Sequence, residues 1–178
     1  MVRQWTRAGL AAAVMAGCAV LPSSGIGHDR PTLDRETTRQ LTVAARTLLE
    51  RRSEALVQAG HRDRRPLAEI LGVRISPRVA KVQERAEREL EHRNRAPVEG
   101  GPAYTEARTR LEPKRAVRTG DRITLEATEH TEVRHETGKL TQSIRRRFDF
   151  STLDGQVVLV DERVLDPEAH PLNDPDPR

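Results

Sequence analysis

The densest group of potentially reactive side chains is the segment His130-Thr131-Glu132-Val133-Arg134-His135. Histidine and glutamate bind metal ions, and a zinc site needs three or four such ligands that converge on one point. Alternate residues of an extended strand point to opposite faces, so His130 and Glu132 share one face while His135 lies on the other. The segment therefore indicates a solvated strand face, and we expect no metal site there.

Glu129 comes directly before this segment and has the same alternation phase as Ile123 and Leu125. A carboxylate on the apolar face of a strand points toward the interior, where it needs polar partners. We therefore predict that Glu129 is a polar group of a pocket. Tyr104 and His135 are the two further pocket candidates.

Nucleophilic catalysis has little support in the sequence. The chain has one cysteine, Cys18. None of its serines lies in the G-x-S-x-G elbow of hydrolases. The sequence also lacks a glycine-rich phosphate loop and the metalloprotease motif H-E-x-x-H. We therefore expect no catalytic residue, no cofactor and no enzymatic activity.

Residues 1–27 are predicted to be an export signal. Arg3 and Arg7 form a basic region, the apolar run Ala8–Leu21 follows, and small residues lead to Gly27. This order is typical of a secretory signal peptide. The apolar run has 14 residues, whereas a helix that spans a bilayer needs roughly 18 or more.

Two ways of processing this signal stay open. Met15-Ala16-Gly17-Cys18 resembles the lipobox of bacterial lipoproteins, in which the cysteine is acylated and anchors the mature chain. In the other, cleavage near Gly25 or Gly27 removes Cys18. The protein is therefore expected to be secreted or lipid-anchored at the outer face of the cytoplasmic membrane. A lipid on Cys18 is the only membrane contact that we expect.

The composition argues against a nucleic-acid partner. All but three of the 31 basic residues are arginines, which bind phosphate well, and Arg145-Arg146-Arg147 is their densest cluster. However, 27 acidic residues are interleaved with them, and aromatic residues, which stack on bases, make up only 2% of the chain. We therefore expect the partner to be a protein or an envelope component.

Residues 28–102 are expected to be the helical part of a single domain. Apolar residues recur at spacings of three and four, which predicts a first helix that begins between Thr32 and Asp34 and stops at Gly60. The stripe consists of Leu41, Ala45, Leu48, Leu49, Arg52 and Leu56.

A second helix is predicted from Ser76, the N-cap, and Pro77, the first helical position, to about Asn94. Between the two helices, Pro66 can open a short helical turn that runs to Leu71. The stripe of the second helix consists of Val79, Val82, Ala86 and Leu90.

Residues 103–166 change to a period of two, which predicts four antiparallel strands. The expected turns are Gly120-Asp121, Thr137-Gly138 and Asp154-Gly155. Asp-Gly favours a type I′ hairpin turn. Residues 167–178 are rich in proline and aspartate, and we expect them to be extended or disordered. The fold class is therefore α+β, with helices packed on one face of a curved four-stranded meander.

The sheet part resembles a known family. The stretches Gly120–Leu125, Arg146–Phe150, Asp154-Gly155 and Leu159-Val160 are similar to the N-terminal accessory region of secreted bacterial proteins that carry an amidase domain. The resemblance implies a cystatin-like or NTF2-like fold. Val157 departs from the family, which usually has tryptophan after the Asp-Gly turn. The papain-like catalytic domain of that family has no counterpart in the sequence, so the resemblance implies no hydrolase activity.

Three functions stay open at this point. The first is an exported, non-enzymatic accessory or binding protein of the cell envelope. The second is an orphan accessory or regulatory domain for a separate cell-wall amidase or peptidase. The third is a small-ligand-binding α+β cone with a pocket around Glu129 and Tyr104.

Overall fold

The structure is a computed structural model, and it describes residues 33–57, 66–93 and 103–175. Several predictions lie outside these residues. They are the export signal with Cys18, the helix start at Thr32, the helix stop at Gly60 and the helix end at Asn94.

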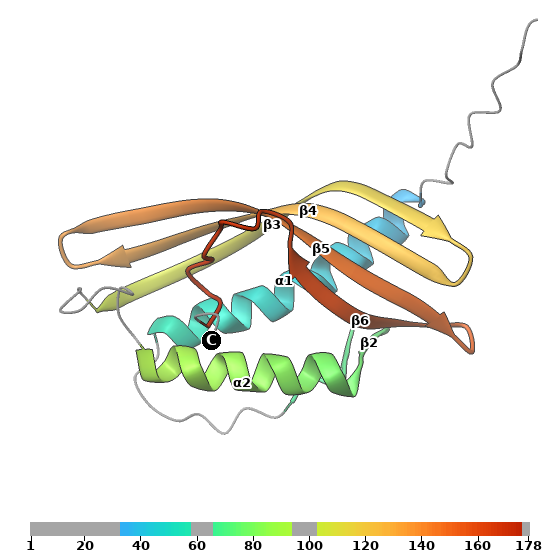
Figure 1. Cartoon of the computed structure of the whole chain (residues 1–178), viewed down its shortest axis with the longest axis horizontal. Coiled ribbons are helices and arrows are strands. Elements are labelled where there is room, and N and C mark those ends of the chain that lie inside the picture. Colours follow the sequence, from blue (N-terminus) through green and yellow to red (C-terminus); the bar gives the residue numbers. More distant parts are fainter. Residues whose placement is uncertain (1–32, 58–65, 94–102, 176–178) are drawn as a thin grey trace, which may run out of the picture.

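The described residues form an α+β domain in which two helices lie on one side of a curled sheet (Figure 1). The strands follow the order β1-β2-β6-β5-β4-β3 across the sheet. The elements are α1 (Arg35–Val57), β1 (Glu69–Ile70), β2 (Val73–Ile75), α2 (Pro77–Arg93), β3 (Tyr104–Thr119), β4 (Arg122–His135), β5 (Gly138–Leu153) and β6 (Gln156–Val164).

The sheet differs from the predicted four-stranded antiparallel meander, because β1 and β2 extend it to six strands. Strands β3 to β6 form the antiparallel meander, but β2 pairs with β6 in parallel, so the sheet is mixed. The predicted helical turn from Pro66 to Leu71 is wrong. Leu71 and Gly72 have φ of 49° and 79°, and positive φ at both central residues makes a tight hairpin turn instead of a helix.

Both helices begin at side-chain caps. The backbone N–H of Thr37 donates to Asp34 Oδ1 at 2.9 Å, so Asp34 caps α1. A hydrogen bond from the Thr37 hydroxyl and this backbone hydrogen bond hold the pKa of Asp34 below its usual value. Ser76 Oγ accepts from Val79 N at 3.3 Å, which confirms the predicted cap of α2. Val82 of the predicted stripe is exposed, because the buried face of α2 is turned toward Gln83 and Glu87.

The hairpin turns follow the sequence prediction closely. Asp154 and Gly155 have φ of 50° and 76°, and they join Leu153 to its partner Gln156, which confirms the type I′ prediction. The turn between β4 and β5 is Glu136-Thr137, one residue earlier than predicted.

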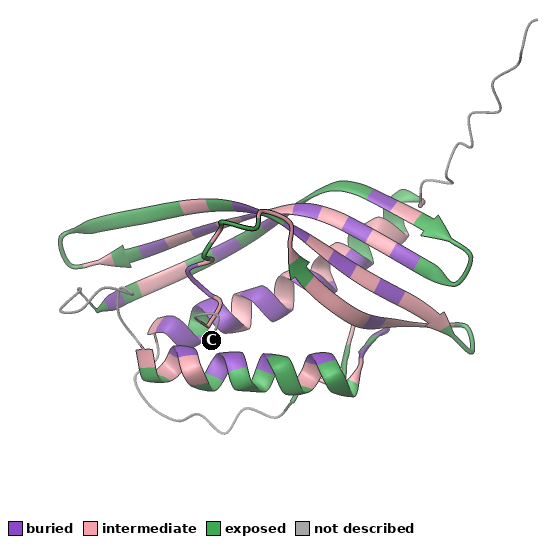
Figure 2. Cartoon of the chain, viewed as in Figure 1, coloured by how far each residue is buried: buried purple, intermediate pink, exposed green. Residues whose placement is uncertain are grey.

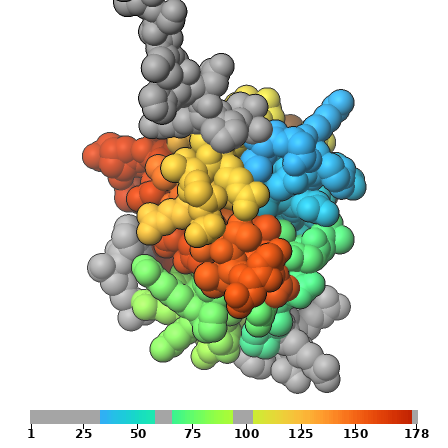
Figure 3. All heavy atoms as spheres, turned by 90° about the vertical axis from the view of Figure 1, so that its right-hand side faces the viewer, coloured from blue at the N-terminus to red at the C-terminus, as the bar shows by residue number. Residues whose placement is uncertain are grey.

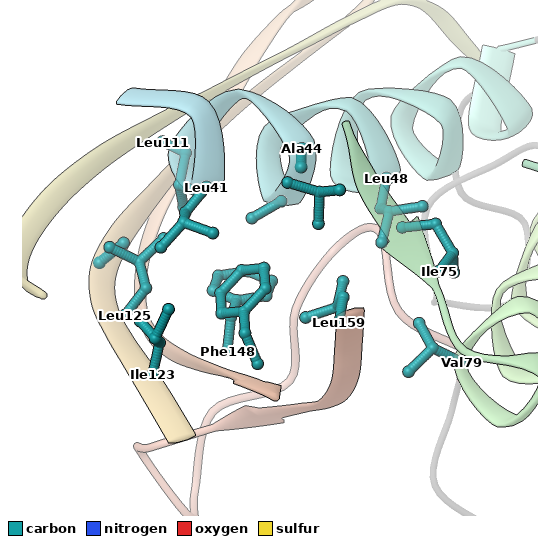
Figure 4. Packing of buried hydrophobic residues seen from close by; sticks show 14 of the residues in the cluster. Leu41, Ala44, Leu48, Ile75, Val79, Leu111, Ile123, Leu125, Phe148 and Leu159 are labelled. Atoms are coloured by element: carbon teal, nitrogen blue, oxygen red, sulfur yellow. The ribbon is translucent and has the colours of Figure 1, made fainter. Parts of the chain in front are cut away.

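Most of the buried apolar residues belong to two clusters. Along the strands, buried residues alternate with more exposed ones (Figure 2). The larger cluster fills the space between α1 and the meander, where Leu41, Leu125 and Leu159 surround Phe148 (Figure 4). The smaller cluster consists of Ala55, Leu56, Leu90, Tyr104, Val133 and Leu172.

Candidate functional site

A layer of polar side chains lies between these two apolar clusters. In α1, Arg52 and Ser53 follow the residues of the larger cluster and precede Leu56 of the smaller one. We name this set the polar layer. Its members are Arg52, Ser53, Gln83, Glu87, Thr109, Glu129, Thr131, Arg146, Glu162, Asn173 and Asp174.

Arg52 of α1 is bound through all three guanidinium nitrogens. Its Nη1 and Nη2 donate to the two carboxylate oxygens of Glu162 at 3.0 and 2.7 Å. Nη1 also donates to Asp174 Oδ1 at 2.7 Å, and Nε donates to Gln83 Oε1 at 2.7 Å. This paired geometry gives strong, directional charge-assisted hydrogen bonds.

Arg146 of β5 is 1% exposed and has an equally complete set of partners. Its Nε donates to Glu129 Oε2 at 2.5 Å, and Nη1 donates to Glu162 and Asp174 at 2.8 and 3.0 Å. Burial by itself lowers the pKa of Arg146, but the three carboxylates outweigh it and raise that pKa above its ordinary value. Glu162 and Asp174 therefore each bridge the two buried arginines.

Asp174 belongs to the C-terminal segment, residues 165–175, and its side chain is 19% exposed. Burial raises the pKa of this carboxyl, but the charges of Arg146 and Arg52 and their hydrogen bonds lower it more. The net effect holds the pKa of Asp174 below its usual value.

The prediction that the C-terminal segment is extended or disordered is only partly right. The described part has no helix or strand, but it is firmly docked on the domain. Leu172 and Asn173 are buried, and Leu172 belongs to the smaller apolar cluster. The proline content of the segment predicted an irregular backbone, which it has. The segment is nevertheless docked, because the polar layer supplies partners for the side chains of Asn173 and Asp174.

A β-bulge places Glu162 in the polar layer. Phe150 pairs with Leu159, but Asp149 pairs with Asp161, so the register shifts at Val160. Uninterrupted alternation from Leu159 would turn residues 161 and 163 inward. The extra residue instead aligns Glu162 with Phe148 and directs its carboxylate toward both arginines.

The three predicted pocket residues do not come together. Glu129 is fully enclosed, and its carboxylate accepts from Arg146, from Asn173 Nδ2 at 2.6 Å and from Thr131 Oγ1 at 3.1 Å. Tyr104 and His135 are register partners at the far end of the sheet. His135 lies six residues along β4 from Glu129, about 20 Å at the usual rise of a strand.

Tyr104 itself is buried in the smaller apolar cluster, and burial raises the pKa of its phenol. A bulge after Tyr104 shifts the phase of β3, and Thr105 is exposed. His130 lies on the outer face and contacts Ser143 Oγ at 2.8 Å. Within the described ranges, no three side chains of the metal-binding types are grouped around a common point.

A cleft of about 350 Å³ opens between α2 and β6, next to the polar layer. Arg52, Arg146 and Asp174 line its inner end, and Val79, Val82 and Ala86 give it an apolar wall. Figure 3 shows the side of the molecule where α2, in green, lies beside the hairpin of β5 and β6. We name the 350 Å³ cleft between the helix and the strand the α2–β6 cleft.

Sequence reasoning recognised Glu129 but missed the two arginines and the two carboxylates that bridge them. Signals for the arginines were present: Arg52 lies within the apolar stripe of its helix, and Arg146 has the phase of Ile144 and Phe148. A charged residue at a core position indicates a buried ion pair, because an unpaired buried charge is very costly.

Comparisons with known proteins provide little beyond this geometry. No family model matches the chain, and no curated protein matches it. The crystal structure of the intermembrane space region of chloroplast protein ARC6 is similar over 76% of this chain and 98% of that chain, with 15% identity and a TM-score of 0.44. Neither described helix is long and apolar enough to cross a membrane.

Proposed function

We propose that this protein is an exported, non-enzymatic accessory domain that binds a component of the cell envelope in the α2–β6 cleft. The cleft carries the proposal, because it combines an apolar wall with the charged side chain of Arg78. Concave sites with a few convergent polar groups are the usual places for ligands. Export is supported by the order of basic, apolar and small residues in the sequence 1–27.

Binding fits the chemistry of the cleft better than proton transfer does. A general acid or base needs a side chain that can exchange a proton with the substrate. At the inner end of the cleft, Glu162 and Asp174 are instead held by Arg52 and Arg146. The more exposed Arg78 can bind an anionic group without disturbing these pairs.

The finer fold class proposed with this function is cystatin-like or NTF2-like. A long helix, α1, packed along a curled antiparallel meander supports it. The alternative function is an accessory or regulatory domain for a separate cell-wall amidase or peptidase. The docked C-terminal segment favours that alternative, because it is a peptide without helix or strand, with turns at residues 167–168 and 172–173, that is held against the domain.

Sedimentation with purified peptidoglycan sacculi tests the proposal. The mature chain, residues 28–178, should sediment with sacculi, whose peptides carry free carboxylates that arginine binds. Arg78→Gln should lower the bound fraction several-fold, because it removes a positive charge from the cleft and leaves the polar layer intact. Lys81→Gln is the matched control, since Lys81 is an exposed cation of α2 that does not line the cleft.

Two results would contradict the proposal. A mature chain that stays in the supernatant does not bind this envelope component. Equal binding by the Arg78→Gln and Lys81→Gln variants would place the interaction outside the cleft.

A further inference from the structure

The geometry points to a peptide-recognition groove that the chain's own Leu172-Asn173-Asp174 occupies. We propose that a partner protein presenting an apolar residue, an asparagine and an aspartate in succession binds there by displacing this segment. The inference rests on the proposed function, since it names the chemistry of a partner for the accessory domain.

Leu172 occupies the apolar part of the groove. Its side chain is buried in the smaller apolar cluster with Leu90 of α2, Tyr104 of β3 and Val133 of β4. An apolar side chain is required here, because these neighbours offer it a hydrocarbon surface.

Asn173 is recognised by both ends of its amide. Its Nδ2 donates to Glu129 Oε1 at 2.6 Å and to Ser53 Oγ at 3.1 Å. Its Oδ1 accepts from Arg146 Nη2 at 3.3 Å. An amide supplies two donors and an acceptor at once, whereas an aspartate at this position would place its carboxylate against Glu129.

Asp174 is recognised by charge. Its two carboxylate oxygens accept from Arg52 and Arg146 at 2.7 and 3.0 Å. The three adjacent side chains therefore meet three different surfaces: one apolar, one polar and one cationic.

The backbone of the segment is bound as well, independently of its side chains. Gln142 of β5 accepts from Leu172 N and donates to the carbonyl of His170, both at 2.9 Å. Arg93 of α2 donates to the carbonyls of Leu172 and Asp174. Main-chain hydrogen bonds combined with side-chain pockets are the usual basis of peptide recognition.

Charge balance favours displacement of this segment. Of the charged groups paired around Arg52 and Arg146, Asp174 has the most exposed side chain, and its backbone is in neither helix nor strand. Without Asp174, the two arginines face Glu129 and Glu162, one carboxylate for each. The vacated groove therefore has balanced formal charge, and an incoming carboxylate restores the present arrangement.

Peptide binding to the full mature chain tests the inference. The probe is a fluorescein-labelled peptide with the sequence of residues 169–175, Ala-His-Pro-Leu-Asn-Asp-Pro. It should bind Asp174→Asn about tenfold more tightly than the unaltered chain, because the internal competitor has lost its charge. A control peptide with asparagine in place of its aspartate should bind this variant about tenfold more weakly than the probe.

A second measurement applies if Asp174→Asn does not fold. The unlabelled peptide should accelerate hydrogen exchange of the Leu172 amide in the unaltered chain, because displacement breaks its bond to Gln142. Unchanged exchange, or equal affinity for both peptides, would overturn the inference. If peptides fail to compete while Arg78→Gln still lowers sacculus binding, only this inference fails. If peptides displace the C-terminal segment but the chain does not bind sacculi, the proposed envelope ligand is wrong, whereas the peptide-recognition groove is supported.

Discussion

Three consecutive arginines in β5 provide a direct test of the polar layer. Arg146 lies inside it, whereas Arg147 is on the outer face, where it pairs with Asp149. Arg146→Met keeps a long side chain but removes the cation that binds Glu129, Glu162 and Asp174. Glu162 and Asp174 would then keep their pairs with Arg52, whereas Glu129 would lose the arginine that binds it.

The expected loss of stability is large. Removing one partner of a buried ion pair costs about 3–5 kcal/mol, out of a total stability of about 5–15 kcal/mol for an ordinary domain. Arg147→Met is the matched control, since its side chain is 34% exposed. Loss of such a partly exposed pair costs about 0–1 kcal/mol.

Equilibrium urea denaturation followed by far-UV circular dichroism measures both variants. With a mid-range urea dependence of about 2 kcal/mol per molar, Arg146→Met should move the midpoint down by roughly 1.5–2.5 M. Arg147→Met should leave it within about 0.5 M. Equal midpoints for the two variants would refute the buried-pair reasoning.

Three further predictions follow from the turn, the C-terminal segment and the signal. Gly155→Val should lower the stability by about 1–3 kcal/mol, because φ is 76° there and a β-branched residue is strained at positive φ. An added Cβ would have no atom within 4 Å, so no new packing contact would offset the strain. An unchanged melting temperature would contradict this prediction. The lowered pKa of Asp174 adds stability that is present above about pH 3.9 and lost as pH falls through the folded pKa. As the pH is lowered from 6 to 2, the urea midpoint of the unaltered chain should therefore fall more steeply than that of Asp174→Asn. Parallel curves for the two proteins would show that Asp174 does not cause the loss of stability in acid. Mass spectrometry of the exported protein should find either acylated Cys18 or a start near Gly25 to His28, whereas an intact Met1 would exclude export.

The sequence predicted the meander because its signals are local. Alternation from Ile123 to Val133 matches the buried face of β4, and Asp154-Gly155 defines its hairpin through backbone preference alone. The β1–β2 hairpin was missed because Leu71 adopts positive φ, which is uncommon outside glycine, asparagine and aspartate.

The candidate site was harder to predict because it depends on pairings between distant segments. Glu162 faces the arginines only through the bulge at Val160, and nothing in the sequence around it specifies that shift. Asp174 lies 122 positions from Arg52, in a segment whose proline content alone favours disorder. Alternation did direct Glu129 inward, but its partners depend on how the C-terminal segment docks.

The polar layer has a consequence for how the domain is held together. Buried ion pairs rarely add stability over an apolar core of the same volume, because desolvation offsets their attraction. In this domain they determine the position of the C-terminal segment. Asn173 and Asp174 meet their hydrogen-bond and charge partners in one placement of that segment, whereas an apolar surface would allow several placements. We therefore infer that the layer fixes where this segment docks. The same geometric selectivity would let the groove distinguish one partner peptide from another, which links the fold to the proposed recognition.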